Sequence, residues 1–169
     1  METLKYCPIC GSKLSQKSIE GIDRSCCAST DCDFVHWDNP LPVVAALIEY
    51  QGQILLAQNT KWPSGIFSLI TGFLERKESP EQAVIREVKE ELNLDGRVDR
   101  FIGFYPFDKM NQIIMAFSVT ADGILKTNKE IAQTKLITIP QLRAHDFGPL
   151  YITTAIVRDW FNQSTKVKD

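Results

Sequence analysis

The cysteines of this chain are confined to one short N-terminal segment. All five cysteines of the 169-residue sequence lie between Cys7 and Cys32, and the rest of the chain contains none. The first pair stands in a C-P-I-C-G knuckle, and the pair Cys27 and Cys32 has C-x4-C spacing. Tetrahedral Zn²⁺ prefers four thiolate or imidazole ligands. We therefore predict that Cys7, Cys10, Cys27 and Cys32 bind a structural Zn²⁺.

The sequence is also compatible with other ligand sets and other uses of these thiols. Cys26 could replace Cys27, and His36 could replace one sulfur. Disulfides are disfavoured because the N-terminus lacks the apolar core of a secretory signal and a reducing cytosol keeps thiols free. Ordinary free cysteines are a further alternative. Few apolar residues lie between Cys7 and Asp33, so this segment is expected to fold only with bound metal.

The remaining composition is that of an ordinary globular protein. The chain is 44% hydrophobic and 24% charged, which fits one main domain with a small appendage. No run approaches the ~18 to 20 apolar residues needed to cross a bilayer. We expect a soluble, cytoplasmic protein with no membrane partner. The net charge of -2 makes nucleic acid an unfavoured partner.

Two prolines at positions 40 and 42 mark a boundary. We expect a zinc ribbon at 1–38 and a main domain at 39–169. Apolar and β-branched runs predict strands at 43–49, 54–58, 67–70, 97–105, 113–121 and 135–139. Helical spacing predicts a helix that begins after Ser79 and a closing helix at 152–161. The expected fold class is α/β, with a mixed sheet between helices.

The first helix carries clear start and stop signals. Ser79 is a natural N-cap, Pro80 suits the first helical position, and Gln82 completes a capping box. Asn93 tolerates the left-handed conformation that ends a helix. One face of the helix is apolar and is predicted to enter the core: Val84, Ile85, Val88 and Leu92.

The opposite face of this helix gathers acidic residues. Three glutamates project close together on this face, since Glu90 and Glu91 follow Glu87 by three and four residues, and their like charges repel. Arg86 can neutralise only part of this charge. A divalent cation would reverse the sign of this interaction, and carboxylate oxygens suit Mg²⁺ or Mn²⁺. The alternative is a solvated acidic face with surface salt bridges.

The spacing around these glutamates resembles the Nudix box, G-x5-E-x7-R-E-U-x-E-E-x-G-U, in which U is apolar. The sequence reads Gly72-x5-Glu78-x7-Arg86-Glu87-Val88-x-Glu90-Glu91-x-Asn93-Leu94. One specified position differs, because Asn93 stands in place of the last glycine. Both residues accept the backbone conformation that ends a helix.

The resemblance implies an α/β/α sandwich that hydrolyses a pyrophosphate linked to a nucleoside, with Mg²⁺ or Mn²⁺. By motif position, the metal ligands would be Glu87, Glu90 and Glu91, helped by a backbone carbonyl of Thr71 or Gly72. Glu78 and Arg86 would brace the loop and the helix. Glu91 is the candidate for a metal ligand that also activates water.

The cysteine ribbon followed by F-V-H-W-D-N-P resembles the zinc-ribbon branch of this superfamily, which includes bacterial NADH pyrophosphatases and suggests a homodimer. Two motifs of that branch differ here. Only Pro106-Phe107 remains of its S-Q-P-W-P-F-P-x-S signature, and Gln133 stands where an E-[LI]-x-E-x-x-W pattern often supplies a further carboxylate. Glu130 is the local candidate to replace that carboxylate.

Four aromatic residues near the expected cleft are candidates to stack on a base, with core packing as the alternative for each: Trp62, Phe104, Tyr105 and Phe107. The expected function is divalent-metal-dependent hydrolysis of a dinucleotide, NADH or ADP-ribose type of substrate. One alternative is a nucleotide-sensing module whose ribbon contacts protein or nucleic acid. Another is a pyrophosphohydrolase that acts on the 5′ end of RNA.

Overall fold

The structure is a computed structural model that describes residues 4–165, with side chains described to residue 163. The chain divides after Asn39 into two compact units. None of the helices within the described range combines the length and apolar character that crossing a membrane requires.

The N-terminal unit is a small antiparallel sheet. Its strands occur in the order β1-β2-β3 and are β1 (Leu14–Ile19), β2 (Ile22–Cys27) and β3 (Val35–His36). Glu20 and Gly21 connect the first two strands, and both have positive φ, as a tight hairpin turn requires. Among residues 4–39, the fully buried side chains are three cysteines: Cys7, Cys26 and Cys27. This unit therefore has almost no hydrophobic core.

The second unit contains a mixed six-stranded sheet. Five strands run in the order β7-β8-β4-β5-β9, and β6 also pairs with β4. Their bounds are β4 (Leu41–Tyr50), β5 (Gln53–Asn59), β6 (Ile70–Phe73), β7 (Asp95–Phe107), β8 (Gln112–Asp122) and β9 (Ile131–Ile137). A short 3₁₀ turn, η1 (Asp108–Met110), connects β7 to β8. The central pair of β4 and β8 is parallel, and the other pairs are antiparallel.

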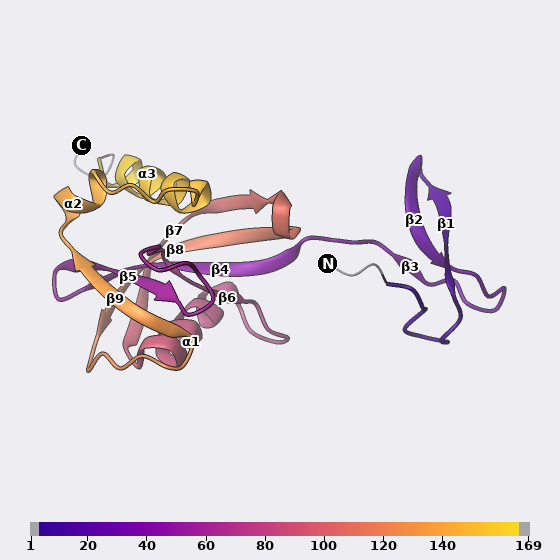
Figure 1. Ribbon diagram of the computed structural model, residues 1–169, viewed down its shortest axis with the longest axis horizontal. Helices are drawn as coiled ribbons and strands as arrows, with labels where there is room; N and C mark the ends of the chain where they lie inside the picture. Colours follow the sequence, from indigo (N-terminus) through magenta and orange to yellow (C-terminus); the bar gives the residue numbers. More distant parts are fainter. Residues whose placement is uncertain (1–3, 166–169) are drawn as a thin grey trace. The chain divides into compact units, whose positions relative to one another are not determined.

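Helices cover both faces of this sheet (Figure 1). They are α1 (Pro80–Leu92), α2 (Ile139–Arg143) and α3 (Tyr151–Thr165). Successive residues of β4 alternate between two cores: Val43, Ala45 and Leu47 pack on the α3 side, and Val44, Ala46 and Ile48 on the α1 side. The predicted α/β/α sandwich with a mixed sheet is confirmed.

The local signals around α1 are also confirmed. The Ser79 hydroxyl accepts a hydrogen bond from the Gln82 backbone N–H, and the Gln82 side chain accepts one from the Ser79 N–H. Asn93 ends the helix with φ of 60° and ψ of 18°, which is the left-handed conformation. This explains why asparagine can occupy the last glycine position of the box.

Two predicted strands were misplaced, and one helix was missed. The strand expected at 67–70 is β6, which begins at Ile70, because Ser68 makes only an isolated bridge to Ala57. The strand expected at 135–139 is β9, which ends at Ile137. Thr138 then caps the missed helix α2, whose five residues are too few for a periodic signal.

Candidate metal centre and substrate pocket

Arg86 connects α1 to the loop that precedes it. Its guanidinium donates two hydrogen bonds to the Glu78 carboxylate, at 3.0 Å from Nε and 2.8 Å from Nη2. Nη2 also donates to the Phe73 carbonyl at 3.0 Å. The Glu78 carboxylate accepts a further bond from the Glu75 N–H. These contacts, led by the hydrogen bond from Arg86, lower the pKa of Glu78. Both residues thus fix the loop to the helix, the role that the resemblance implied.

Glu87 lies directly against the β6 backbone. A Cβ atom added to Gly72 would collide with the Glu87 carboxylate, so this position has no room for a side chain. Glu87 also accepts a hydrogen bond from Arg86 Nη1 at 2.8 Å, and Glu90 accepts one from the same nitrogen at 3.2 Å. Burial nevertheless raises the pKa of Glu87. The structure therefore brings Glu87 to the predicted backbone ligands.

Glu91 is the anomalous carboxylate of this cluster. Its side chain is 7% exposed, and it forms no hydrogen bond or ion pair with the described residues. Burial, with smaller contributions from the charges of Glu87, Glu130 and Glu90, raises the pKa of Glu91 to about 7. A buried carboxylate without a partner is costly. A cation placed at this point would remove that cost.

Glu130 belongs to the same electrostatic cluster. Its charge raises the pKa of both Glu87 and Glu91, and it lies exposed just before β9. Gln133, by contrast, lies within β9 opposite Gln58. These four carboxylates are a donor set that fits Mg²⁺ or Mn²⁺. Glu87 and Glu90 are turned toward Arg86 rather than gathered with Glu91 at one point.

A small hollow adjoins Glu91, and a larger apolar pocket shares some of its lining residues. Glu91, Asn59 and Ile131 contribute to the hollow, and Thr71 and Trp62 line both spaces. The apolar pocket has a volume of about 140 Å³ and is walled by strands β4, β6 and β8 and the start of α3. The acidic hollow and the apolar pocket are thus neighbouring spaces that share Thr71 and Trp62 as walls.

The four aromatic candidates have different positions. Trp62 and Phe107 line the apolar pocket. Phe104 is 63% exposed and packs edge-on against Phe101. The prediction that Tyr105 stacks on a base is corrected here, because its ring is buried in the core and its hydroxyl donates to Asp159 at 3.0 Å. Tyr151 lines the pocket and contacts Phe107 edge-on, but its place at a helix start offered no sequence signal.

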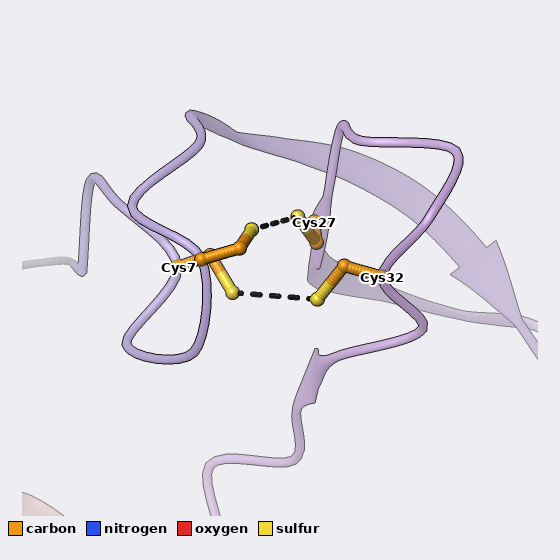
Figure 2. Close-up of side chains that lie close together, drawn as sticks. Cys7, Cys27 and Cys32 are labelled. Atoms are coloured by element: carbon orange, nitrogen blue, oxygen red, sulfur yellow. Dashed lines mark hydrogen bonds between the residues drawn. The ribbon is translucent and has the colours of Figure 1, made fainter.

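The cysteine cluster lies in the N-terminal unit (Figure 2). The sulfur atoms of Cys7 and Cys32 are 3.7 Å apart, and those of Cys10 and Cys27 are 3.4 Å apart. All four sulfurs lie within 4.8 Å of one another. A tetrahedral Zn²⁺ with bonds of about 2.3 Å separates its sulfurs by about 3.8 Å. Hydrogen bonds from Ser12 lower the pKa of Cys10 to about 6, which favours the thiolate.

The fifth cysteine does not belong to this cluster. The Cys26 thiol instead donates to the Arg24 carbonyl at 3.6 Å. His36 lies on β3 opposite Ser25, and it is not among the clustered side chains of the described chain. The geometry therefore fits the predicted set of Cys7, Cys10, Cys27 and Cys32 to Zn²⁺.

Comparison with known proteins identifies the family. The NUDIX domain model matches residues 38–155, so the chain belongs to the Nudix family. It is 32% identical over 126 residues to NAD-capped RNA hydrolase NudC of Vibrio atlanticus (strain LGP32), covering 74% of this chain and 45% of that protein. The protein of the same name from Vibrio vulnificus (strain CMCP6) is 32% identical over 83% of this chain and 53% of its own length.

The chain thus spans about half the length of these relatives. Among solved structures, a NUDIX hydrolase from Nitrosomonas europaea superimposes with a TM-score of 0.72 and 26% identity. That likeness covers 80% of this chain and 78% of the other.

Proposed function

We propose that this protein is a divalent-metal-dependent hydrolase that cleaves the pyrophosphate bond of a nucleoside diphosphate linked to another group. The observation that carries the proposal is Glu91, a buried carboxylate without a partner that lies among the charges of Glu87, Glu90 and Glu130. The names of the two Vibrio relatives, which describe hydrolases of an NAD-capped substrate, support the same reaction class.

Glu87, Glu90 and Glu91, with a carbonyl of Thr71 or Gly72, would hold Mg²⁺ or Mn²⁺. The bound ions supply charge for the phosphate oxygens and a water of lowered pKa. Arg86 and Glu78 keep the loop and α1 in register. Glu91 would take the proton of the attacking water at its carboxylate. Water adds to one phosphorus, the bridging P–O bond breaks, and two monophosphates leave.

The apolar pocket would receive the base or nicotinamide ring of the substrate. Trp62, Phe107 and Tyr151 supply aromatic surface, and the pocket shares the wall residue Thr71 with the Glu91 hollow. A substrate that joins a planar ring to a pyrophosphate would span both spaces. Dinucleotides of the NADH type and ADP-ribose meet this requirement.

A second candidate substrate is the 5′ end of RNA that carries an NAD cap. The names of the two relatives favour it. The acidic composition disfavours an extended nucleic-acid surface, so we expect any RNA to be engaged mainly at its 5′ end.

The remaining assignments complete this proposal. Residues 1–38 would form a ribbon whose Zn²⁺ has a structural role, because its four cysteines leave no ligand position open for chemistry. Residues 39–169 would form the catalytic domain. A homodimer and a cytoplasmic location follow from the family resemblance.

A substrate panel tests the proposal. Purified zinc-loaded protein is incubated with NADH, NAD⁺, ADP-ribose or NAD-capped RNA, each with Mg²⁺ or Mn²⁺, and the monophosphate products are quantified. We expect turnover of at least one substrate. Tight binding without product from any of them would instead favour a nucleotide-sensing module.

The Glu91→Gln variant is the first test of mechanism. We expect it to lower kcat by at least about 100-fold, because it removes both a ligand charge and the proton acceptor. Glu81→Gln is the matched control, since Glu81 is exposed in the first turn of the same helix. Equal activity of both variants would contradict the role of Glu91.

A further inference from the structure

A second pocket lies between α2 and α3, apart from the glutamate cluster. It has a volume of about 200 Å³ and is bounded by the end of α2, the following loop and one stripe of α3. Its apolar floor consists of the buried side chains Leu142, Phe147, Val157 and Phe161. None of its lining residues belongs to the apolar pocket or to the hollow beside Glu91. It is therefore a separate site.

The charged groups that line this pocket are cationic. Arg143 lies over the Phe161 ring at 4.1 Å, and His145 contacts the Phe147 ring edge-on at 4.7 Å. Arg158 projects from the adjacent turn of α3. Burial and the positive charge of Lys135 lower the pKa of His145, against the opposing charge of Asp146, so the His145 ring is neutral near pH 7 and the positive charge of the lining comes from the two arginines. The lining contains no carboxylate.

The two guanidinium groups retain unused donors. Within the described part of the chain, Arg143 forms no ion pair and no hydrogen bond. Arg158 reaches Asp159 through Nε alone, at 3.1 Å, which leaves both terminal nitrogens available. Two acids lie nearby: Asp159 pairs with Arg158 through Oδ1 and accepts from Tyr105 through Oδ2, and Asp146 accepts from the Gly148 N–H.

We propose that this α2–α3 pocket binds a phosphate group, either as free phosphate or as the phosphate of a small phosphomonoester. Arginine forks match phosphate oxygens in a bidentate geometry. Stacking on Phe161 orients the Arg143 fork before a ligand arrives. A divalent cation is excluded by the sign of the lining charge. A whole dinucleotide is excluded by size, because pockets for such ligands measure about 300 to 1,000 Å³.

The α3 helix is a wall of both pockets. It presents Ile152, Thr153 and Ile156 to the apolar pocket and Thr154, Val157 and Arg158 to the phosphate pocket. A phosphate bound on one side would therefore contact the element that shapes the other side.

Calorimetric titration of the full zinc-loaded chain with inorganic phosphate, without added Mg²⁺ or Mn²⁺, tests the proposal. We expect the double variant Arg143→Gln with Arg158→Gln to weaken binding by at least about tenfold, as loss of charged hydrogen bonds requires. Arg143→Lys should fall between the double variant and the unmodified protein, because it keeps the charge and loses the fork. Arg97→Gln is the matched control, since Arg97 is an exposed arginine that pairs with Asp99 on β7.

A parallel titration with AMP identifies the source of the phosphate. Tighter binding of AMP than of phosphate, lost in the double variant, assigns the pocket to a nucleotide phosphate. Equal affinities assign it to free phosphate. The proposal is overturned if the unmodified protein binds neither ligand at millimolar concentration, or if the double variant binds as Arg97→Gln does. Melting temperatures confirm that each variant is folded. Because no divalent metal or turnover is involved, the result is independent of the proposed hydrolysis.

Discussion

The two units of this protein are stabilised by different means. In the N-terminal unit the buried side chains of the described residues are three cysteines, and two of them belong to the group of four whose sulfurs lie within 4.8 Å of one another. In the second unit, two apolar clusters fill both faces of a six-stranded sheet. A short segment cannot bury enough apolar surface to offset its conformational entropy, whereas a longer domain can. A cluster of potential metal ligands thus stands in the shorter unit where the longer one has a hydrophobic core.

The largest effect expected from this comparison is the loss of the ribbon when zinc is lost. Cys27→Ser, or a chelator, should unfold the N-terminal unit, because metal binding and folding are one process there. In NMR spectra the amide signals of residues 4–39 should lose their chemical-shift dispersion, while those of the sheet domain should keep it. The neighbouring substitution Cys26→Ser is the control and should keep one zinc per chain. A ribbon that stays folded without zinc would remove the distinction between the units.

Truncation of a core side chain should have the opposite effect to zinc loss, because it should destabilise the sheet domain and leave the ribbon intact. Leu92 is fully buried at the end of α1, so Leu92→Ala should lower the free energy of unfolding of the sheet domain by about 2–5 kcal/mol. The zinc content should not change. Urea unfolding followed by circular dichroism measures the loss. Ile124→Ala, at an 82% exposed position, should cost less than about 0.5 kcal/mol. Similar costs for both variants would show that the domain lacks a packed core.

The buried carboxylate predicts how stability depends on pH. Burial raises the pKa of Glu91 from 4.5 to about 7, so the folded state holds this proton more tightly than the unfolded state. Without divalent metal, the contribution of Glu91 to the free energy of unfolding should be highest below pH 4.5. It should fall by on the order of 3 kcal/mol as the pH rises to about 7, and then level off.

Thermal unfolding of the zinc-loaded protein across this pH range, in the absence of Mg²⁺ and Mn²⁺, measures that slope. Glu91→Gln has no titratable group at this position and should reduce the slope. Adding Mg²⁺ should raise stability most at high pH, where Glu91 is ionised. If Glu91→Gln leaves the slope of stability against pH unchanged, other titratable groups cause that slope.

The smallest effect concerns the end of α1. Asn93→Gly should change stability by less than about 0.5 kcal/mol, because glycine also adopts the positive φ found there. It loses one hydrogen bond from Nδ2 to the Ile124 carbonyl. Asn93→Val should cost more, about 1–2 kcal/mol, because a β-branched residue is strained at this φ. Urea unfolding of both variants gives the comparison.

Features fixed by neighbours in the sequence were the ones predicted well. Ser79, Gln82 and Asn93 cap α1 through contacts within a few residues, and the four clustered cysteines follow from spacing. Features set by distant contacts were not. Tyr105 is buried in a core that includes residues of α3, where its hydroxyl donates to Asp159, 54 residues away. Tyr151 likewise reaches the pocket because α3 packs on the sheet. The start of β6 likewise depends on its pairing with β4.

The parallel pairing of β4 with β8 has a consequence for biosynthesis. Val43 on β4 pairs with Ile114 on β8, so about seventy residues must be made before the central strand gains this neighbour. The four cysteines lie earlier, all within the first 32 residues. During synthesis the ribbon can therefore capture zinc and fold while β4 still has an open apolar edge. In this interval the edge of β4 that later pairs with β8 is unpaired, and an unpaired apolar strand edge favours aggregation.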